Sequence, residues 1–176
     1  VYLDSAATTQ KPQAVIDAIV HYYQHDNANV HRAAHALSGR ATSAFEDSRR
    51  VTAEFLGCAN PAQIIWVRGA TEAINLVAAS WGRSNLAAGD KVLVSAMEHH
   101  SDIVPWQLIC TERGAEVIPV SVTDDGEIDL QALDALLDER VKMVAVNHVS
   151  NALGTINPVQ EIAAKAHAVG ALCMVD

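Results

Sequence analysis

Polar side chains that can do chemistry stand directly after several short apolar runs of the chain. They are Glu98, His99 and His100 after "VLVSAM", Asn147, His148 and Asn151 after "VKMVAV", and Asp176 after "LCMV". In open α/β sheets, ligands bind outside the carboxyl ends of the strands. A carboxylate there can pair with a protonated heteroaromatic nitrogen, because the salt bridge favours the charged form of both groups. We therefore expect Asp176 to contact a ligand; the alternative is that it caps a strand and meets solvent.

The stretch "VRGATEAINLVA" joins a glycine to the predicted start of a helix. The first N–H groups of a helix lack internal partners, and the helix dipole adds partial positive charge there, so a phosphate fits. Gly69 lets the backbone approach a ligand, and Thr71 adds a hydroxyl. The alternative is a plain strand-to-helix turn with Thr71 as the N-cap, since neither a G-x-G-x-x-G sequence nor a Walker lysine is present.

The adjacent histidines and the loop that contains Asn151 are further candidates. An imidazole at such a place can stack on a planar ligand, bind a metal or shuttle protons. Because no H-x-x-x-H or C-x-x-C spacing supports His99 and His100, a metal site is not favoured; capped or surface histidines are the alternative. In "HVSNALGTINP", the Asn151 amide can hydrogen-bond a phenolate or a carboxylate, or it simply forms a turn.

Short apolar runs alternate with amphipathic stretches from residue 58 onward. The predicted strands are 63–67, 91–96, 115–122, 141–149 and 171–176, and the predicted helices between them are 71–82, 102–114, 129–139 and 159–170. Strands that are apolar on both faces and separated by helices are typical of βαβ units. The fold class is therefore α/β, with a mostly parallel sheet covered by helices on both faces.

The first 57 residues have a different pattern and are predicted to form a separate helical segment that carries an entrance loop of the active site. Residues 10–25 place Val15, Ile16, Ile19 and Tyr23 on one face of a helix, with Pro12 near its start. Residues 40–56 form a longer predicted helix, and Gly57 is a plausible stop. The remainder, 58–176, is interpreted as part of a larger α/β domain.

Composition excludes several classes of protein. The net charge is −9 and no cluster of Lys and Arg forms a basic face, which argues against a nucleic-acid partner. No apolar run approaches the ~20 residues that span a bilayer, and Val1 does not open a signal peptide. The three cysteines have neither metal-ligand nor disulfide spacing, so we expect reduced thiols in a cytoplasmic protein that has no membrane partner.

Several motifs occur together and in order: "YLDSAATTQKP", "NVHRAAHALS", "VRGATEAINLVAASWG", "AMEHHSDIVPWQ", "HVSNALGTINP" and the closing "VD". This set resembles the N-terminal half of the SufS-type cysteine desulfurases. Those proteins are pyridoxal 5′-phosphate (PLP) enzymes of fold type I in the class V aminotransferase group. The resemblance covers essentially the whole chain, and IscS-like relatives usually differ at the histidine pair.

The resemblance implies a cofactor site. Ala70 and Thr71 would hold the PLP phosphate. His100 would stack on the pyridine ring and shuttle protons as a catalytic residue. Asn151 would hydrogen-bond the ring hydroxyl, and Asp176 would pair with the pyridine nitrogen, which lets the ring act as an electron sink.

The resemblance also implies a substrate side. Asn151 would approach the substrate carboxylate, Ala6 and Ala7 would line the substrate side, and His31 and Arg32 would lie near the entrance and the partner of a homodimer. The implied reaction converts L-cysteine, and also L-selenocysteine, to the amino acid alanine. The sulfur would pass as a persulfide to an acceptor of the SufE or SufU kind for iron–sulfur cluster assembly.

In this family, the lysine that forms the Schiff base and the nucleophilic cysteine belong to motifs expected after residue 176, so we expect the 176 residues alone to be inactive. One alternative is another class V PLP enzyme of the kynureninase-like or epimerase-like kind. The other is a non-catalytic doubly wound binding domain, against which the missing glycine fingerprint argues.

Overall fold

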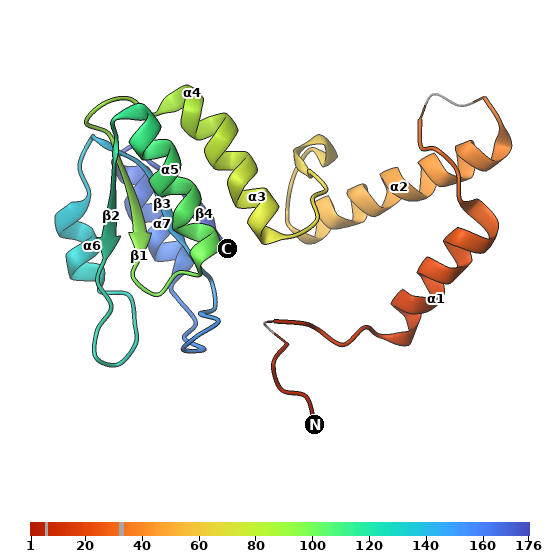
Figure 1. Ribbon diagram of the computed structural model, residues 1–176, viewed down its shortest axis with the longest axis horizontal. Coiled ribbons are helices and arrows are strands. Elements are labelled where there is room, and N and C mark those ends of the chain that lie inside the picture. Colours follow the sequence, from red (N-terminus) through yellow and green to blue (C-terminus); the bar gives the residue numbers. More distant parts are fainter. Residues whose placement is uncertain (6, 32–33) are drawn as a thin grey trace. The chain divides into compact units, whose positions relative to one another are not determined.

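The computed structural model describes residues 1–5, 7–31 and 34–176 and divides into two compact units, 1–66 and 67–176 (Figure 1). The boundary predicted at residue 57 from the sequence stays a prediction. Ala6 and Arg32, two of the predicted substrate-side residues, lie outside the described residues. None of the helices in the described part of the chain is long and apolar enough to cross a bilayer.

The first unit is helical. Its elements are α1 (Gln13–His21), the π-helical turn η1 (Tyr22–Asp26), α2 (Ala36–Phe55) and the 3₁₀ turn η2 (Pro61–Gln63). The helix α2 begins before the predicted residue 40, because the His35 side chain caps it by accepting a hydrogen bond from the Ser38 N–H at 3.1 Å. Gly57 ends it with a φ of 70°, and the next N–H, that of Cys58, donates to Ala53 at 2.8 Å.

The apolar face predicted for α1 is present in sequence but remains exposed. Val15, Ile16 and Ile19 are between 43% and 52% exposed. Ile19 also lines a groove of about 590 Å³ that runs between α1, η1 and α2 within this unit, together with Tyr23 and Phe45.

The second unit is an α/β unit with one parallel sheet. The strands are β1 (Lys91–Ser95), β2 (Glu116–Val120), β3 (Val141–Val146) and β4 (Leu172–Val175), in the order β2-β1-β3-β4. The helical elements are α3 (Ala70–Val77), η3 (Ala78–Gly82), α4 (Arg83–Asn85), η4 (His100–Asp102), α5 (Val104–Arg113), α6 (Leu130–Leu136) and α7 (Val159–Ala168). Every strand pair is parallel, which confirms the predicted fold class.

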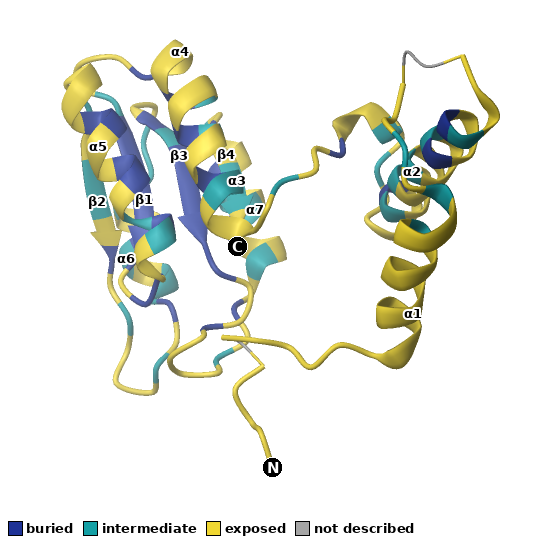
Figure 2. Ribbon diagram, turned by 45° about the vertical axis from the view of Figure 1, so that its right-hand side comes forward, coloured by how far each residue is buried: buried dark blue, intermediate teal, exposed yellow. Residues whose placement is uncertain are grey.

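The sheet has a core on each face because its strands are apolar on both sides. One core packs Leu93, Val144 and Val146 against Leu133 of α6 and Ile162 of α7. Figure 2 shows β1 and β3 as the buried strands of the unit.

The other core packs alternate residues of the same strands, Val92, Val94 and Ala145, against Ala78 of η3 and Trp106 of α5. The alternation follows from the two-residue repeat of a strand. The sheet is therefore a rigid layer with helices on both faces, and it fixes the positions at which its strands end.

The strand predicted at 63–67 is wrong. Residues 61–63 form η2, and residues 64–67 have no partner strand among the described residues. The carbonyl of Ile64, which a strand would use in its ladder, accepts a hydrogen bond from the Arg49 side chain instead. Apolar residues alone do not make a strand when no neighbouring strand satisfies the backbone.

Candidate functional site

The order of the strands reverses between β1 and β3. The chain leaves β1 toward β2 on one side, and it returns to β3 and then β4 on the other side. Ligands of open α/β sheets bind where the strand order reverses, outside the carboxyl ends of the strands. We call the end of the sheet at which the strands finish the carboxyl edge. His100, Asn151 and Asp176 follow β1, β3 and β4 in the chain, so the segments that carry them all leave the sheet at this edge.

The start of α3 offers backbone N–H groups that no side chain caps. Gly69 is the N-cap and makes no side-chain cap hydrogen bond, and the first bond of the helix runs from the Ala73 N–H to the Gly69 carbonyl at 3.1 Å. Thr71 is the second helical residue and is exposed, so the alternative in which its hydroxyl caps the helix is wrong. The hydroxyl remains available for a ligand.

The charges around this helix start favour an anion. Glu72 lies in the first turn, but Arg68 donates to its carboxylate from the backbone N–H at 2.7 Å and from Nε at 3.0 Å. The hydrogen bonds from Arg68 hold the pKa of Glu72 below its usual value. Arg68, Gly69, Thr71, Glu72 and Asn75 line a shallow hollow of about 500 Å³.

His100 begins the short turn η4 that follows β1, and η4 packs against α3. His99 is the N-cap of this turn, since its Nδ1 accepts a hydrogen bond from the Ser101 N–H at 3.2 Å. The alternative of a capping histidine is therefore correct for His99. His100 is exposed, and its ring meets the His99 ring edge-on, with 5.8 Å between the centroids.

Two carboxyl groups, those of Glu98 and Asp102, flank His100, and their burial was not predicted from the sequence. Glu98 is 9% exposed and Asp102 is completely buried. Burial is the main cause that raises the pKa of Glu98, and it raises the pKa of Asp102 to about 7, with a further increase from the charges of Glu98 and Asp176. Asp102 precedes Trp106 by one helical turn, and this spacing was the available sequence signal.

Glu98 also ties the two central strands together at the carboxyl edge. Its Oε1 accepts hydrogen bonds from the hydroxyl of Ser95, the last residue of β1, and from the Asn147 N–H after β3, the latter at 2.9 Å. The Asn147 side chain in turn accepts from Nδ2 of Asn157 at 2.7 Å. These side chains thus form a buried polar network at the carboxyl ends of β1 and β3.

Asn151 lies in the loop after β3, in which residues 151–154 are exposed. The Ser150 N–H donates to the Thr155 carbonyl at 2.9 Å, and an antiparallel bridge pairs Val149 with Ile156. Gly154 has a φ of 75°, which a residue with a side chain rarely adopts, so it provides the predicted turn. The Asn151 side chain is exposed, as its predicted role requires.

Asp176 continues the ladder of β4. Its N–H donates to the Val146 carbonyl at 2.9 Å, and its carbonyl accepts from the His148 N–H at 2.7 Å. The residue is exposed, and its charge acts on both Glu98 and Asp102. The segments after β1 and β4 therefore bring three carboxyl groups close enough to influence one another.

The predicted substrate-side residues belong to the first unit, which is described by itself. The Ala7 N–H donates to Asp4 Oδ1 at 3.2 Å, and both residues are exposed. His31 has a φ of 59°, unusual for a residue with a side chain, and its N–H donates to the Thr42 hydroxyl at 2.9 Å. Its Nε2 lies 3.4 Å from a Glu46 carboxylate oxygen.

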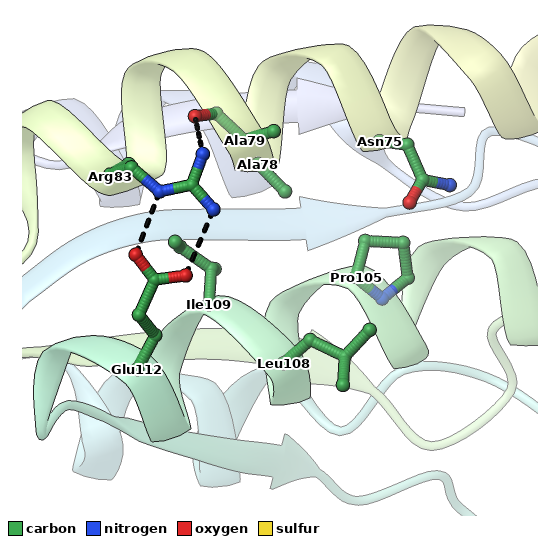
Figure 3. A pocket seen from close by; sticks show the side chains of 8 residues that line it. All are labelled: Asn75, Ala78, Ala79, Arg83, Pro105, Leu108, Ile109 and Glu112. Carbon is green, nitrogen blue, oxygen red and sulfur yellow. Dashed lines mark hydrogen bonds and ion pairs between the residues drawn. The ribbon is translucent and has the colours of Figure 1, made fainter.

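A second hollow in the α/β unit is separate from these residues. Figure 3 shows this cavity of about 140 Å³ between the α3–η3 segment and α5, with Arg83 and Glu112 at one end. The two side chains form a two-fold hydrogen-bonded ion pair at 2.7 and 2.8 Å. None of the residues predicted for the site lines this hollow, and its charges already neutralise each other.

The residues at the carboxyl edge fit a cofactor such as PLP. The uncapped N–H groups at the start of α3 and the free Thr71 hydroxyl suit a phosphate. Asp176 suits a protonated ring nitrogen. In the described ranges 1–5, 7–31 and 34–176, no group of three or more His, Cys, Asp or Glu side chains is arranged to hold a metal ion.

Comparison with known proteins identifies relatives over the whole chain. The family model for aminotransferase class-V matches residues 1–176. A probable cysteine desulfurase from Vibrio cholerae is 52% identical over 100% of this chain, and a cysteine desulfurase from Dickeya dadantii is 54% identical over 99%. The chain spans 44% and 42% of the lengths of these two relatives.

Solved structures agree with this grouping. The apo structure of a cysteine desulfurase from Thermococcus onnurineus NA1 matches with a TM-score of 0.94 and 39% identity, covering 100% of this chain and 43% of that one. The cysteine desulfurase CsdA from Escherichia coli matches with a TM-score of 0.88 and 36% identity, over 99% of this chain and 44% of that one.

Proposed function

Because the chain belongs to the aminotransferase class-V family, we propose that the protein containing it is a PLP-dependent cysteine desulfurase. The reaction takes L-cysteine and a thiol and gives L-alanine and the persulfide of that thiol. The observation that carries the proposal is the carboxyl edge, where the uncapped start of α3 packs beside the His100 turn and Asp176 follows β4. Relatives named cysteine desulfurase support the same activity.

Each residue at this edge has a role in the proposal. The N–H groups of Ala70 and Thr71, with the Thr71 hydroxyl, bind the phosphate. His100 lies against the ring and moves protons, and Asn151 donates to the ring hydroxyl and to the substrate carboxylate. Asp176 keeps the ring nitrogen protonated. With that proton in place, bound PLP serves as an electron sink.

The finer assignment rests on the motifs around the histidine pair. We propose a SufS-type enzyme that acts as a cytoplasmic homodimer and delivers persulfide sulfur to an acceptor of the SufE or SufU kind for iron–sulfur cluster assembly. L-Selenocysteine is a second proposed substrate. Ala6, Ala7, His31 and Arg32 belong to the proposed substrate entrance and its dimer partner.

The experiment is Asp176→Ala in the full-length protein. The variant should keep bound PLP, because Thr71 and His100 are unchanged, but lose at least ~10²-fold in turnover, or about 2.7 kcal/mol of transition-state stabilisation. Asp176→Glu should be impaired less severely. Alanine production from L-cysteine and the absorbance of the bound cofactor measure the two effects.

Two results would contradict the proposal. Near-normal turnover of the Ala variant would mean that Asp176 only ends a strand. If the wild-type protein with PLP formed no alanine from L-cysteine in the presence of a thiol, the activity itself would be wrong, and another class V reaction would have to be sought.

A further inference from the structure

In each of the two carboxyl groups beside His100, one oxygen accepts a hydrogen bond and the other does not. Glu98 Oε1 accepts from Ser95 and from the Asn147 N–H, and Asp102 Oδ1 accepts from Nε1 of Trp106 at 3.0 Å. Glu98 Oε2 and Asp102 Oδ2 are buried and have no hydrogen-bond partner among the described residues. A buried acceptor without a donor costs free energy, so this pair of orphaned oxygens needs an explanation.

The two side chains are close enough to hydrogen-bond to each other when one of them is protonated. Two ionised carboxylates in contact cannot both keep their charge in a dry site, because the repulsion is added to the cost of burial. A single proton between them removes one charge and lets one carboxyl group donate a hydrogen bond to the other. No additional donor is required.

We propose that Glu98 and Asp102 share one proton and, as a hydrogen-bonded pair, fix the turn that carries His100 onto the carboxyl ends of β1 and β3. They are positioning residues, since they act through the turn. The inference concerns how the turn is held and stands independently of the proposed activity.

The surrounding charges agree with a shared proton. The charged group that acts on the pair from a neighbouring strand is Asp176, which is also negative and opposes a second charge. On the helices packed against η4, Glu72 of α3 is bound to Arg68, and Glu112 of α5 is bound to Arg83.

The remaining titratable groups near the pair do not supply a counter-charge to it. Arg113 of α5 donates to the Leu86 carbonyl at 3.0 Å, and Cys110 of the same helix is a buried thiol whose pKa burial raises to about 11. His99 holds Ser101. A proton bound by the pair is thus the remaining way to neutralise one of the two carboxylates.

The contacts of the pair reach three elements. Glu98 bonds the chain after β3, and Asp102 holds the indole of Trp106 in α5. Two backbone bonds close the turn, from the Asp102 N–H to the His99 carbonyl at 2.8 Å and from the Ile103 N–H to the His100 carbonyl at 3.2 Å. A turn this short needs side-chain support to keep one conformation, and the pair provides it.

The first test is infrared spectroscopy of the full-length protein at pH 6, where ordinary carboxyl groups are ionised. Wild type should show the C=O stretch of one protonated carboxylic acid. Asp102→Asn and Glu98→Gln should each abolish this band, because the amide donates to the remaining carboxylate and no proton is needed. The surface control Asp134→Asn should retain it, since Asp134 bonds Lys165 instead.

The two variants distinguish sharing from a single protonated residue. If the band survives in Asp102→Asn, Glu98 alone holds the proton; if it survives in Glu98→Gln, Asp102 alone holds it. Either result overturns the proposal. Absence of the band in wild type would overturn it as well.

The second test is hydrogen exchange of the amides of residues 102 and 103, which report the turn. Asp102→Ala should speed their exchange by at least ~10-fold, a loss typical of one hydrogen bond, whereas Asp102→Asn should restore the wild-type rate. Equal rates in the Ala variant and wild type, or equally fast exchange in both variants, would refute the positioning role. If Asp102→Ala does not fold, the Asn variant and the infrared bands still decide.

Discussion

Replacing Asp102 with asparagine should remove a component of the pH dependence of stability that wild type shows between about pH 4 and pH 7. The native state raises the pKa of this carboxyl from 3.8 to about 7, mainly by burial. The folded protein therefore holds a proton that the unfolded chain releases in this range. Consequently the free energy of unfolding contains a term that is fully present below pH 3.8 and is lost as pH rises through about 7.

The size of this term follows from the same values. At ~1.36 kcal/mol for each pH unit, a rise from 3.8 to about 7 corresponds to about 4 kcal/mol. This is an upper figure, because relaxation of the site and entry of water reduce it. No discount for exposure applies, since Asp102 is completely buried. An asparagine has the same shape and keeps an oxygen for the Trp106 indole, but it does not titrate.

The measurement is denaturant unfolding of the full-length protein at several pH values from 4.5 to 8. The difference in free energy of unfolding between wild type and Asp102→Asn isolates the term from the other carboxylates. As pH rises, the free energy of unfolding of wild type should fall relative to that of the variant. The control Asp134→Asn should follow wild type, because Asp134 is an exposed partner of Lys165. A difference that stays constant within ~0.5 kcal/mol from pH 4.5 to 8, the usual error of additivity, would refute the reasoning.

Three further predictions concern the cofactor site, the core and the surface. Thr71→Ala should weaken PLP binding by ~10-fold or more, the size of one hydrogen bond to a charged group, whereas Thr71→Ser should bind normally; cofactor titration by absorbance measures both. Ile162→Ala should lower the free energy of unfolding by ~2–5 kcal/mol, because Ile162 is completely buried between α7 and the sheet. Arg83→Ala should leave the free energy of unfolding nearly unchanged in the same assay, because its ion pair with Glu112 is half exposed.

The α/β unit could be predicted from the sequence because its pattern is local. Strands such as β3, in which residues 143–146 are all apolar, alternate with helices that carry an apolar stripe, so the parallel sheet and its two covered faces follow directly. Leu133 illustrates the helix pattern, since it lies in the helix predicted over 129–139 and is completely buried in the core. The positions of His100 and Asp176 just after their strands were predictable for the same reason.

Features that depend on distant partners could not be predicted in this way. The segment 64–67 is as apolar as a strand, but its conformation depends on whether another strand is available. Apart from its spacing to Trp106, Asp102 gives no local sign that it is buried, because an Asp at the start of a helix is ordinarily an exposed cap. Its environment is created by Glu98, by Trp106 and by the ends of two strands that are far apart in the sequence.

The charges at the carboxyl edge are separated in a way that the proposed cofactor requires. The start of α3 presents partial positive charge, and Arg68 neutralises Glu72, the acidic residue of its first turn. After β4, Asp176 is exposed, and its charge acts on the Glu98–Asp102 pair. If that pair keeps one proton, it adds one negative charge and not two, and this charge, like that of Asp176, favours a cation at this place. A ligand with an anionic phosphate at one end and a cationic ring nitrogen at the other matches this arrangement in both sign and order.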